Sequence, residues 1–141
     1  MTSPSVTALA EPASAPEVRL AYANQVAISY SFYVVGAATA FIAVALSLSE
    51  TQAGLHTSVM ALGMILAGLR GEVLDRRVGV RRAHTLAMVV LVVALVVLAL
   101  TPTLALTLAA SLGVGLGAGS MFGHITRTLA RGGGVVARLQ V

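Results

Sequence analysis

The chain has 141 residues, is 57% hydrophobic and only 10% charged, and has a mean hydropathy of +0.93, so a soluble domain of this size would have too little polar surface to cover its core. Its formal charge of +4 comes from nine arginines, but these lack the interleaved aromatic residues of a stacking surface, so no nucleic-acid partner is expected. The absence of cysteine excludes disulfides, zinc–thiolate and iron–sulfur cofactors, and a cysteine nucleophile.

The first part of the chain predicts a tail followed by a membrane span. Residues 1–20 are rich in Ser, Pro and Ala and lack apolar periodicity, which is typical of a disordered tail. The uncharged stretch that follows predicts a span from Tyr22 to Leu48. Within it Gln25, Ser29 and Tyr33 share one helix face and could meet a solute in a substrate cavity. Ordinary helix packing is the alternative for such small polar residues.

Three further spans follow from the positions of the charged residues. The second covers Thr51 to Leu69. The uncharged interval from Ala83 to Thr126 has 44 residues, too many for one helix, and Pro102 near its middle predicts a turn. It therefore divides into spans from Thr85 to Leu100 and from Leu104 to Ile125. Because such segments must satisfy their own amides in lipid and are too long for barrel strands, the predicted fold class is an all-α membrane protein.

The arginines predict how the four spans are oriented. They occur in the first tail, between spans two and three, and in the carboxyl-terminal segment, all of which share one side of the membrane. Because short arginine-rich loops stay in the cytoplasm, both termini are expected there, in a multi-pass protein of the cell membrane. The segment 127–141 is expected to be cytoplasmic and to lead into a further, incomplete element.

The stretch from Arg70 to Arg82, RGEVLDRRVGVRR, carries seven charges and predicts a short loop between two spans. Asp75 is expected to accept hydrogen bonds from backbone amides or to lie against a helix amino terminus. Gly71 is expected to allow another helix to approach closely, and Gly79 to adopt the positive φ of a tight turn. The arginines would at least fix the topology and bind anionic lipid.

The segment from Gly54 to Leu91 resembles the second span, cytoplasmic loop and third span of the major facilitator superfamily, whose loop signature is G-x-x-x-D-R-x-G-R-[RK]. The residues that match are Gly71, Asp75, Arg76, Gly79, Arg81 and Arg82. One extra residue precedes Gly79, and Val80 separates it from the arginine pair. The resemblance implies a partial facilitator-type helix bundle. It also implies a conformational latch that holds this loop against a helix of the carboxyl-terminal half of the transporter.

The fourth span contains a glycine series. Gly115, Gly119 and Gly123 recur every four residues and line one helix face where a neighbouring backbone can approach. A dinucleotide-binding loop is disfavoured because no acidic residue follows. Facilitators often carry an arginine before this series, and the residues Leu108 to Ala110 stand there instead.

The three histidines lie near the predicted span ends. None has a spaced carboxylate or second histidine in the sequence, so no metal site or other cofactor is expected. His56 could take part in a proton relay, but interfacial packing is the favoured role for it. No combination of nucleophile, base and orienting residue is present, so the chain is not expected to be an enzyme.

Two functions remain open. One is transport of an unidentified small solute as the first four spans of a facilitator-type secondary transporter, inactive without the missing carboxyl-terminal half because four spans cannot provide alternating access. The other is a complete four-span protein that acts as a homo-oligomeric small exporter or a noncatalytic scaffold. A small exporter would carry a glutamate within its first span, and this span has none.

Overall fold

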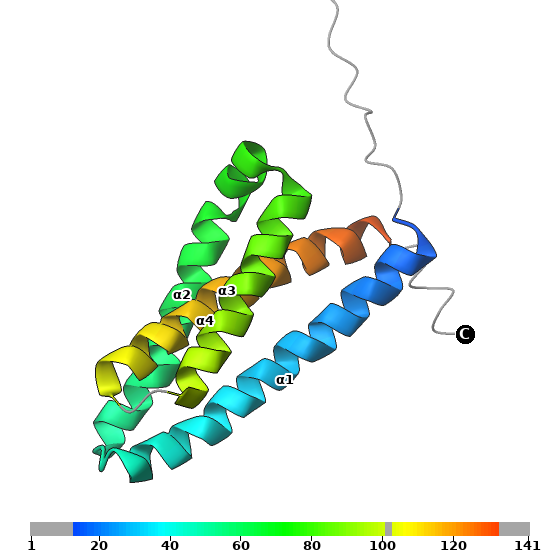
Figure 1. Cartoon of the computed structure of the whole chain (residues 1–141). Coiled ribbons are helices and arrows are strands. Elements are labelled where there is room, and N and C mark those ends of the chain that lie inside the picture. The colour runs from blue at the N-terminus through cyan, green and yellow to red at the C-terminus, as the bar shows by residue number, and fades with distance from the viewer. Residues whose placement is uncertain (1–12, 101–102, 133–141) are drawn as a thin grey trace, which may run out of the picture.

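The computed structural model describes residues 13–100 and 103–132, which form four long helices (Figure 1). These are α1 (Ala15–Ala45), α2 (Glu50–Val78), α3 (Val80–Leu100) and α4 (Leu104–Arg131). The described residues contain no strand, which confirms the all-helical fold class. All four helices are long and apolar enough to cross a membrane, as expected for a multi-pass membrane protein.

The first helix begins earlier than the sequence predicts. The disordered tail was expected to extend over residues 1–20, but α1 starts at Ala15. The backbone amide and hydroxyl of Ser14 donate to the Glu17 carboxylate at 2.7 and 2.9 Å, which closes a capping box at the first turn. Because these capping residues are polar, the apolar stretch alone does not predict that the helix begins here. The rest of that predicted tail, residues 1–12, lies outside the described residues.

The largest correction concerns the predicted loop from Arg70 to Arg82. It is mostly helical, because α2 continues to Val78 and only Gly79 separates it from α3. Gly79 has a φ of 85°, the positive value expected of a tight turn. Within the extension Arg76 donates to Glu72 one turn earlier, a pairing that supports an exposed helix. Charged residues mark where the apolar span ends, but they do not end the helix.

The carboxyl-terminal boundaries differ in the same way. α4 begins at Leu104 as predicted but continues to Arg131, so the start of the predicted cytoplasmic segment 127–141 is helical. The remainder of that segment, from residue 133, lies outside the described residues, and so does Pro102 with its predicted turn.

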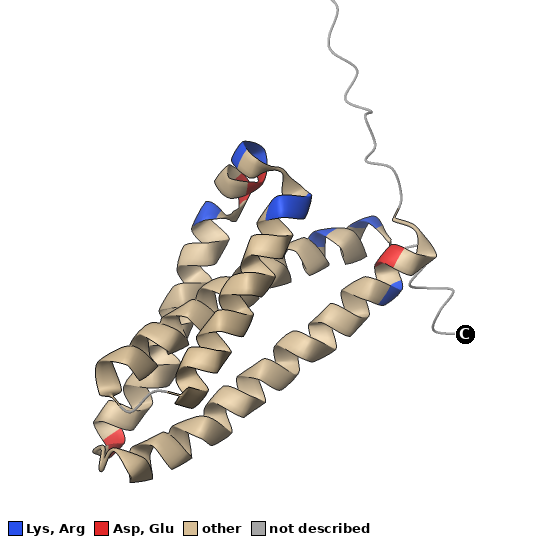
Figure 2. Cartoon of the chain, in the orientation of Figure 1, with Lys and Arg blue, Asp and Glu red and all other residues tan. Residues whose placement is uncertain are grey.

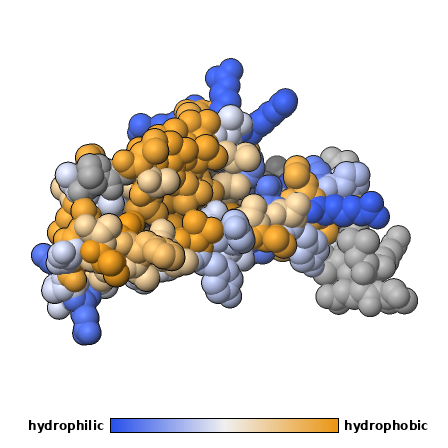
Figure 3. Space-filling model, turned by 60° about the horizontal axis from the view of Figure 1, so that its bottom comes forward, coloured by the Kyte–Doolittle hydropathy of each residue, from blue (hydrophilic) through white to orange (hydrophobic). Residues whose placement is uncertain are grey.

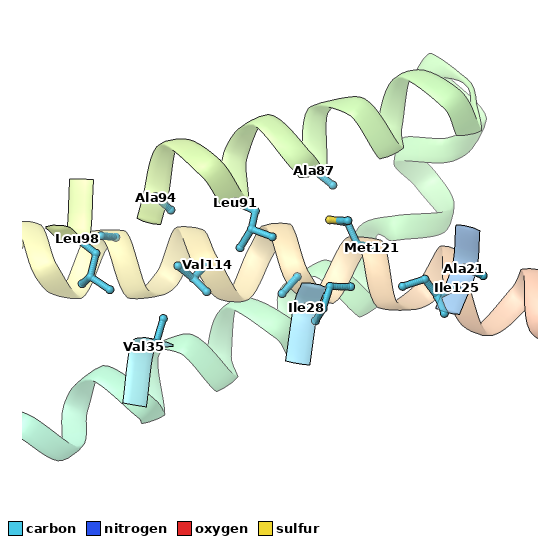
Figure 4. Close-up of a cluster of buried hydrophobic side chains, with 12 residues drawn as sticks. Ala21, Ile28, Val35, Ala87, Leu91, Ala94, Leu98, Val114, Met121 and Ile125 are labelled. Atoms are coloured by element: carbon cyan, nitrogen blue, oxygen red, sulfur yellow. The ribbon is translucent and has the colours of Figure 1, made fainter. Parts of the chain in front are cut away.

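The fourth helix is central and packs against the other three (Figures 1 and 4). A Cβ placed on Gly115 would overlap the carbonyl oxygen of Met60 in α2, and one on Gly117 would lie 2.8 Å from the carbonyl oxygen of Ala87 in α3. Because glycine has no side chain, the backbones of α2 and α3 can approach opposite sides of α4 at these positions. A single apolar cluster joins α1, α3 and α4, to which α1 contributes Ala21, Ile28 and Val35 at intervals of seven residues (Figure 4).

The charged residues gather mainly at one end of the bundle, which we call the charged end (Figure 2). The start of α1, the α2–α3 turn and the end of α4 all lie toward that end, while Glu50 lies at the opposite end. Between these ends large apolar side chains cover the outer surface (Figure 3), for example Phe41 at 76% exposure and Leu69 at 73%. Such a surface suits contact with lipid rather than water.

Candidate functional site

The candidate site lies at the charged end, where the last turns of α2 and α4 face each other. The Asp75 carboxylate accepts a hydrogen bond from Arg127 Nη2 at 2.7 Å. Its other oxygen lies 3.4 Å from His124 Nε2. The side chain of Asp75 is 9% exposed, whereas that of Arg127 is 50% exposed. The acid is therefore largely withdrawn from solvent and is compensated by a charge-assisted hydrogen bond between two helices.

Further contacts orient the basic partners of Asp75. Arg127 Nε donates to the carbonyl oxygen of Gly123 at 3.1 Å, and its Nη2 lies 3.2 Å from His124 Nδ1. A neutral His124 ring with its proton on Nε2 accepts from Arg127 and presents its N–H to Asp75. The His84 ring of α3 packs edge-on against His124, with 5.6 Å between ring centroids. Three helices thus contribute to one cluster, Asp75, His84, His124 and Arg127.

The cluster differs from the loop residues that the sequence singled out. Among the residues that match the facilitator loop signature, Asp75 belongs to the cluster. Arg76 does not, because it pairs with Glu72 on an exposed face. Arg81 and Arg82 are exposed in the first turn of α3. No described atom outside its own helix backbone comes within 4 Å of a Cβ placed on Gly71, so no helix of the described chain makes the expected close approach there. The Asp75 carboxylate also binds side chains rather than the backbone amides expected of it.

The predicted polar stripe of α1 lies away from a cavity at the charged end. Gln25 and Ser29 are half-buried and Tyr33 is 78% exposed. A cavity of about 1110 Å³ opens instead at the charged end, between α1, α3 and α4, and none of these three side chains lines it. A different set of residues therefore surrounds this recess.

The glycine series divides between two environments. Gly115 and Gly119 face α2, and a Cβ on Gly119 would lie 2.9 Å from Met64 Cα. A Cβ on Gly123 would have only Arg127 Nη2 within 4 Å, at 3.9 Å. Two of the three glycines thus lie at a helix contact, and the third lies beside the charged cluster.

A second polar link joins α2 and α4 at the opposite end. His56 is fully buried, with Nε2 2.9 Å from Thr107 Oγ1 and Nδ1 3.2 Å from the carbonyl oxygen of Ala53. The Thr107 hydroxyl donates to the carbonyl oxygen of Leu104 at 2.9 Å, so its oxygen accepts from a protonated Nε2 of His56. The His56 ring is thus held between α2 and α4 by a buried polar contact, as a packing residue would be.

Sequence reasoning missed the partners of Asp75, since Arg127 follows it by 52 positions. A signal was present, because His84, His124 and Arg127 all fall near span ends predicted on the same side of the membrane. Among the described residues no three His, Asp or Glu side chains are placed to hold a metal ion. Comparisons with known proteins found no matching family model, no similar curated protein and no similar solved structure. What the site can do therefore follows from its own residues.

Proposed function

We propose that the chain forms the amino-terminal four spans of a facilitator-type secondary transporter that moves a small solute across the cell membrane. The contact between Asp75 and Arg127 carries this proposal. Asp75 is the acid that matches the facilitator loop signature, and through this contact it links α2 to α4. The gathering of arginines at one end supports a cytoplasmic position for both termini.

The contact suits a gate that has two arrangements. A carboxylate at 9% exposure loses a charge-assisted partner if the ends of α2 and α4 separate, so a state with these ends together is favoured. Transport by rocking requires a second bundle around a midplane site, so in this proposal the chain supplies one bundle, with the α2–α4 contact inside it, and a carboxyl-terminal half supplies the other.

The experiment begins with the protein in its native membrane. Peptides of the 54–91 segment should belong to a species much larger than 14.3 kDa. In that full-length protein Asp75→Asn is expected to reduce transport, measured by solute flux in vesicles, while leaving the inserted amount unchanged. Glu72→Gln removes an acid one turn away whose ion pair is exposed, and it should preserve flux.

Two outcomes would contradict the proposal. One is normal flux through the Asp75→Asn protein at a normal inserted amount. The other is a native species of only 14.3 kDa, and solute flux through that chain in liposomes would instead favour the homo-oligomeric exporter.

A further inference from the structure

A crevice separates α1 from α3 at the charged end. Both helices pack on α4 but make little direct contact with each other. The recess between them has a volume of about 1110 Å³ and is lined by side chains of all three helices. Leu20 and Ala21 of α1 and Ile125 of α4 give it apolar walls, while Arg81 and Arg131 supply guanidinium groups from α3 and α4.

The charge of this lining is strongly biased toward cations. Three arginines line the crevice, against one carboxylate, that of Glu17. Glu17 already accepts two hydrogen bonds from Ser14, and Arg127 is paired with Asp75. In the described part of the chain, Arg81 and Arg131 have no acid within ion-pair distance, although Arg131 is near enough to the Glu17 carboxylate to interact with it electrostatically. Two guanidinium groups from different helices are thus available to an anion, and their planar donor geometry suits phosphate oxygens.

The boundary between α1 and α3 stays open farther from the charged end. A second groove of about 190 Å³ lies between the same two helices and is lined almost entirely by carbon. Its walls include Val34 and Ala38 of α1 and Leu95 and Leu98 of α3. The hydroxyl of Ser31, which also lines it, is satisfied by the carbonyl oxygen of Ala27. This groove suits a hydrocarbon chain and offers nothing to a soluble anion.

We propose that the crevice binds an anionic phospholipid, with its phosphate between Arg81 and Arg131 and one acyl chain against the groove between α1 and α3. Charge complementarity at the mouth favours the anion, and the apolar walls favour a lipid over free phosphate. Basic pockets between membrane helices bind lipid head groups by the same combination of forces. The site needs no second transporter half and is independent of the proposed transport function.

The test measures lipid retained by the purified 141-residue chain. Native mass spectrometry from micelles with equal amounts of phosphatidylglycerol and phosphatidylcholine is expected to show selective retention of phosphatidylglycerol. The double variant Arg81→Gln/Arg131→Gln should lower that retention on the order of tenfold. Arg70→Gln/Arg77→Gln removes the same charge at the same end but outside the crevice, and should change retention less than about twofold. Circular dichroism checks that both variants remain helical.

The acyl-chain position is tested separately. Val34→Trp fills the groove without altering charge and is expected to weaken phosphatidylglycerol retention, whereas Val26→Trp, on α1 outside the groove, should not. Equal retention of the two lipids would overturn the site. An equal loss of phosphatidylglycerol retention in the two double arginine variants would also overturn the site, because it would show only general attraction of the lipid to a basic surface. Competition by glycerol phosphate at lipid-like concentrations would identify a soluble phosphate as the ligand and overturn the lipid assignment.

Discussion

His56 and Thr107 form the more deeply buried of the two polar links between α2 and α4, since both have 0% exposure, whereas Asp75 and Arg127 remain partly exposed. A buried polar atom that loses its partner retains the cost of desolvation, so removing one member costs more than removing a surface contact. Hydrogen bonds between membrane helices contribute modestly, about 0.6 kcal/mol on average.

We expect Thr107→Val to lower the free energy of unfolding by about 1 kcal/mol, because it keeps the shape but leaves His56 Nε2 without its partner. Titration of the purified protein with denaturing detergent, followed by circular dichroism, measures this change. Thr126→Val is the matched control, since that hydroxyl is exposed and bonds only within α4.

A double-mutant cycle isolates the link itself. His56→Phe and Thr107→Val should show a coupling energy of about 0.6 kcal/mol or more, because each variant removes the same hydrogen bond. Strict additivity of the two changes, or an equal loss in the Thr126→Val control, would show that the link does not stabilise the helix pair.

At the scale of the helices, α4 can be central because several of its contact positions lack side chains. Gly115→Ala places a Cβ on the carbonyl oxygen of Met60, so α2 and α4 must move apart. We expect a loss of about 1 to 3 kcal/mol in the same unfolding assay. Gly123→Ala has only a flexible guanidinium at 3.9 Å, and it should leave stability unchanged or raise it by up to about 1 kcal/mol through better helix propensity. Similar stability of the two variants would contradict the packing of α4 described above.

The helices were more predictable from the sequence than their ends. Long uncharged intervals predicted all four, and the start of α4 at Leu104 was predicted correctly, because a span requires about 20 apolar residues. The extension of α2 to Val78 was missed because helical hydrogen bonding continues past the last apolar residues of the predicted span. The partner of Asp75 was missed for another reason, since contacts between distant helices depend on packing that no local pattern records.

At the scale of the whole molecule, the absence of cysteine turns the predicted orientation into a direct measurement. Every thiol in a single-cysteine variant is an introduced one, so labelling has no background from the protein itself. Ser47 lies in the exposed turn between α1 and α2, and Glu72 lies in the exposed extension at the charged end. In the predicted orientation the two positions therefore report on opposite sides of the membrane. Neither replacement removes an arginine, so the charge bias that orients the spans is preserved.

We expect a membrane-impermeant maleimide to label Ser47→Cys in intact cells and Glu72→Cys only after permeabilisation. Val93→Cys, in the apolar middle of α3, should react only after denaturation. The reverse pattern for Ser47→Cys and Glu72→Cys would place the arginines outside and contradict the cytoplasmic termini. Labelling of both in intact cells would mean that the apolar helices do not hold one orientation. The arginines of the α2–α3 region oppose that outcome, because five of them would have to leave the cytoplasmic side together.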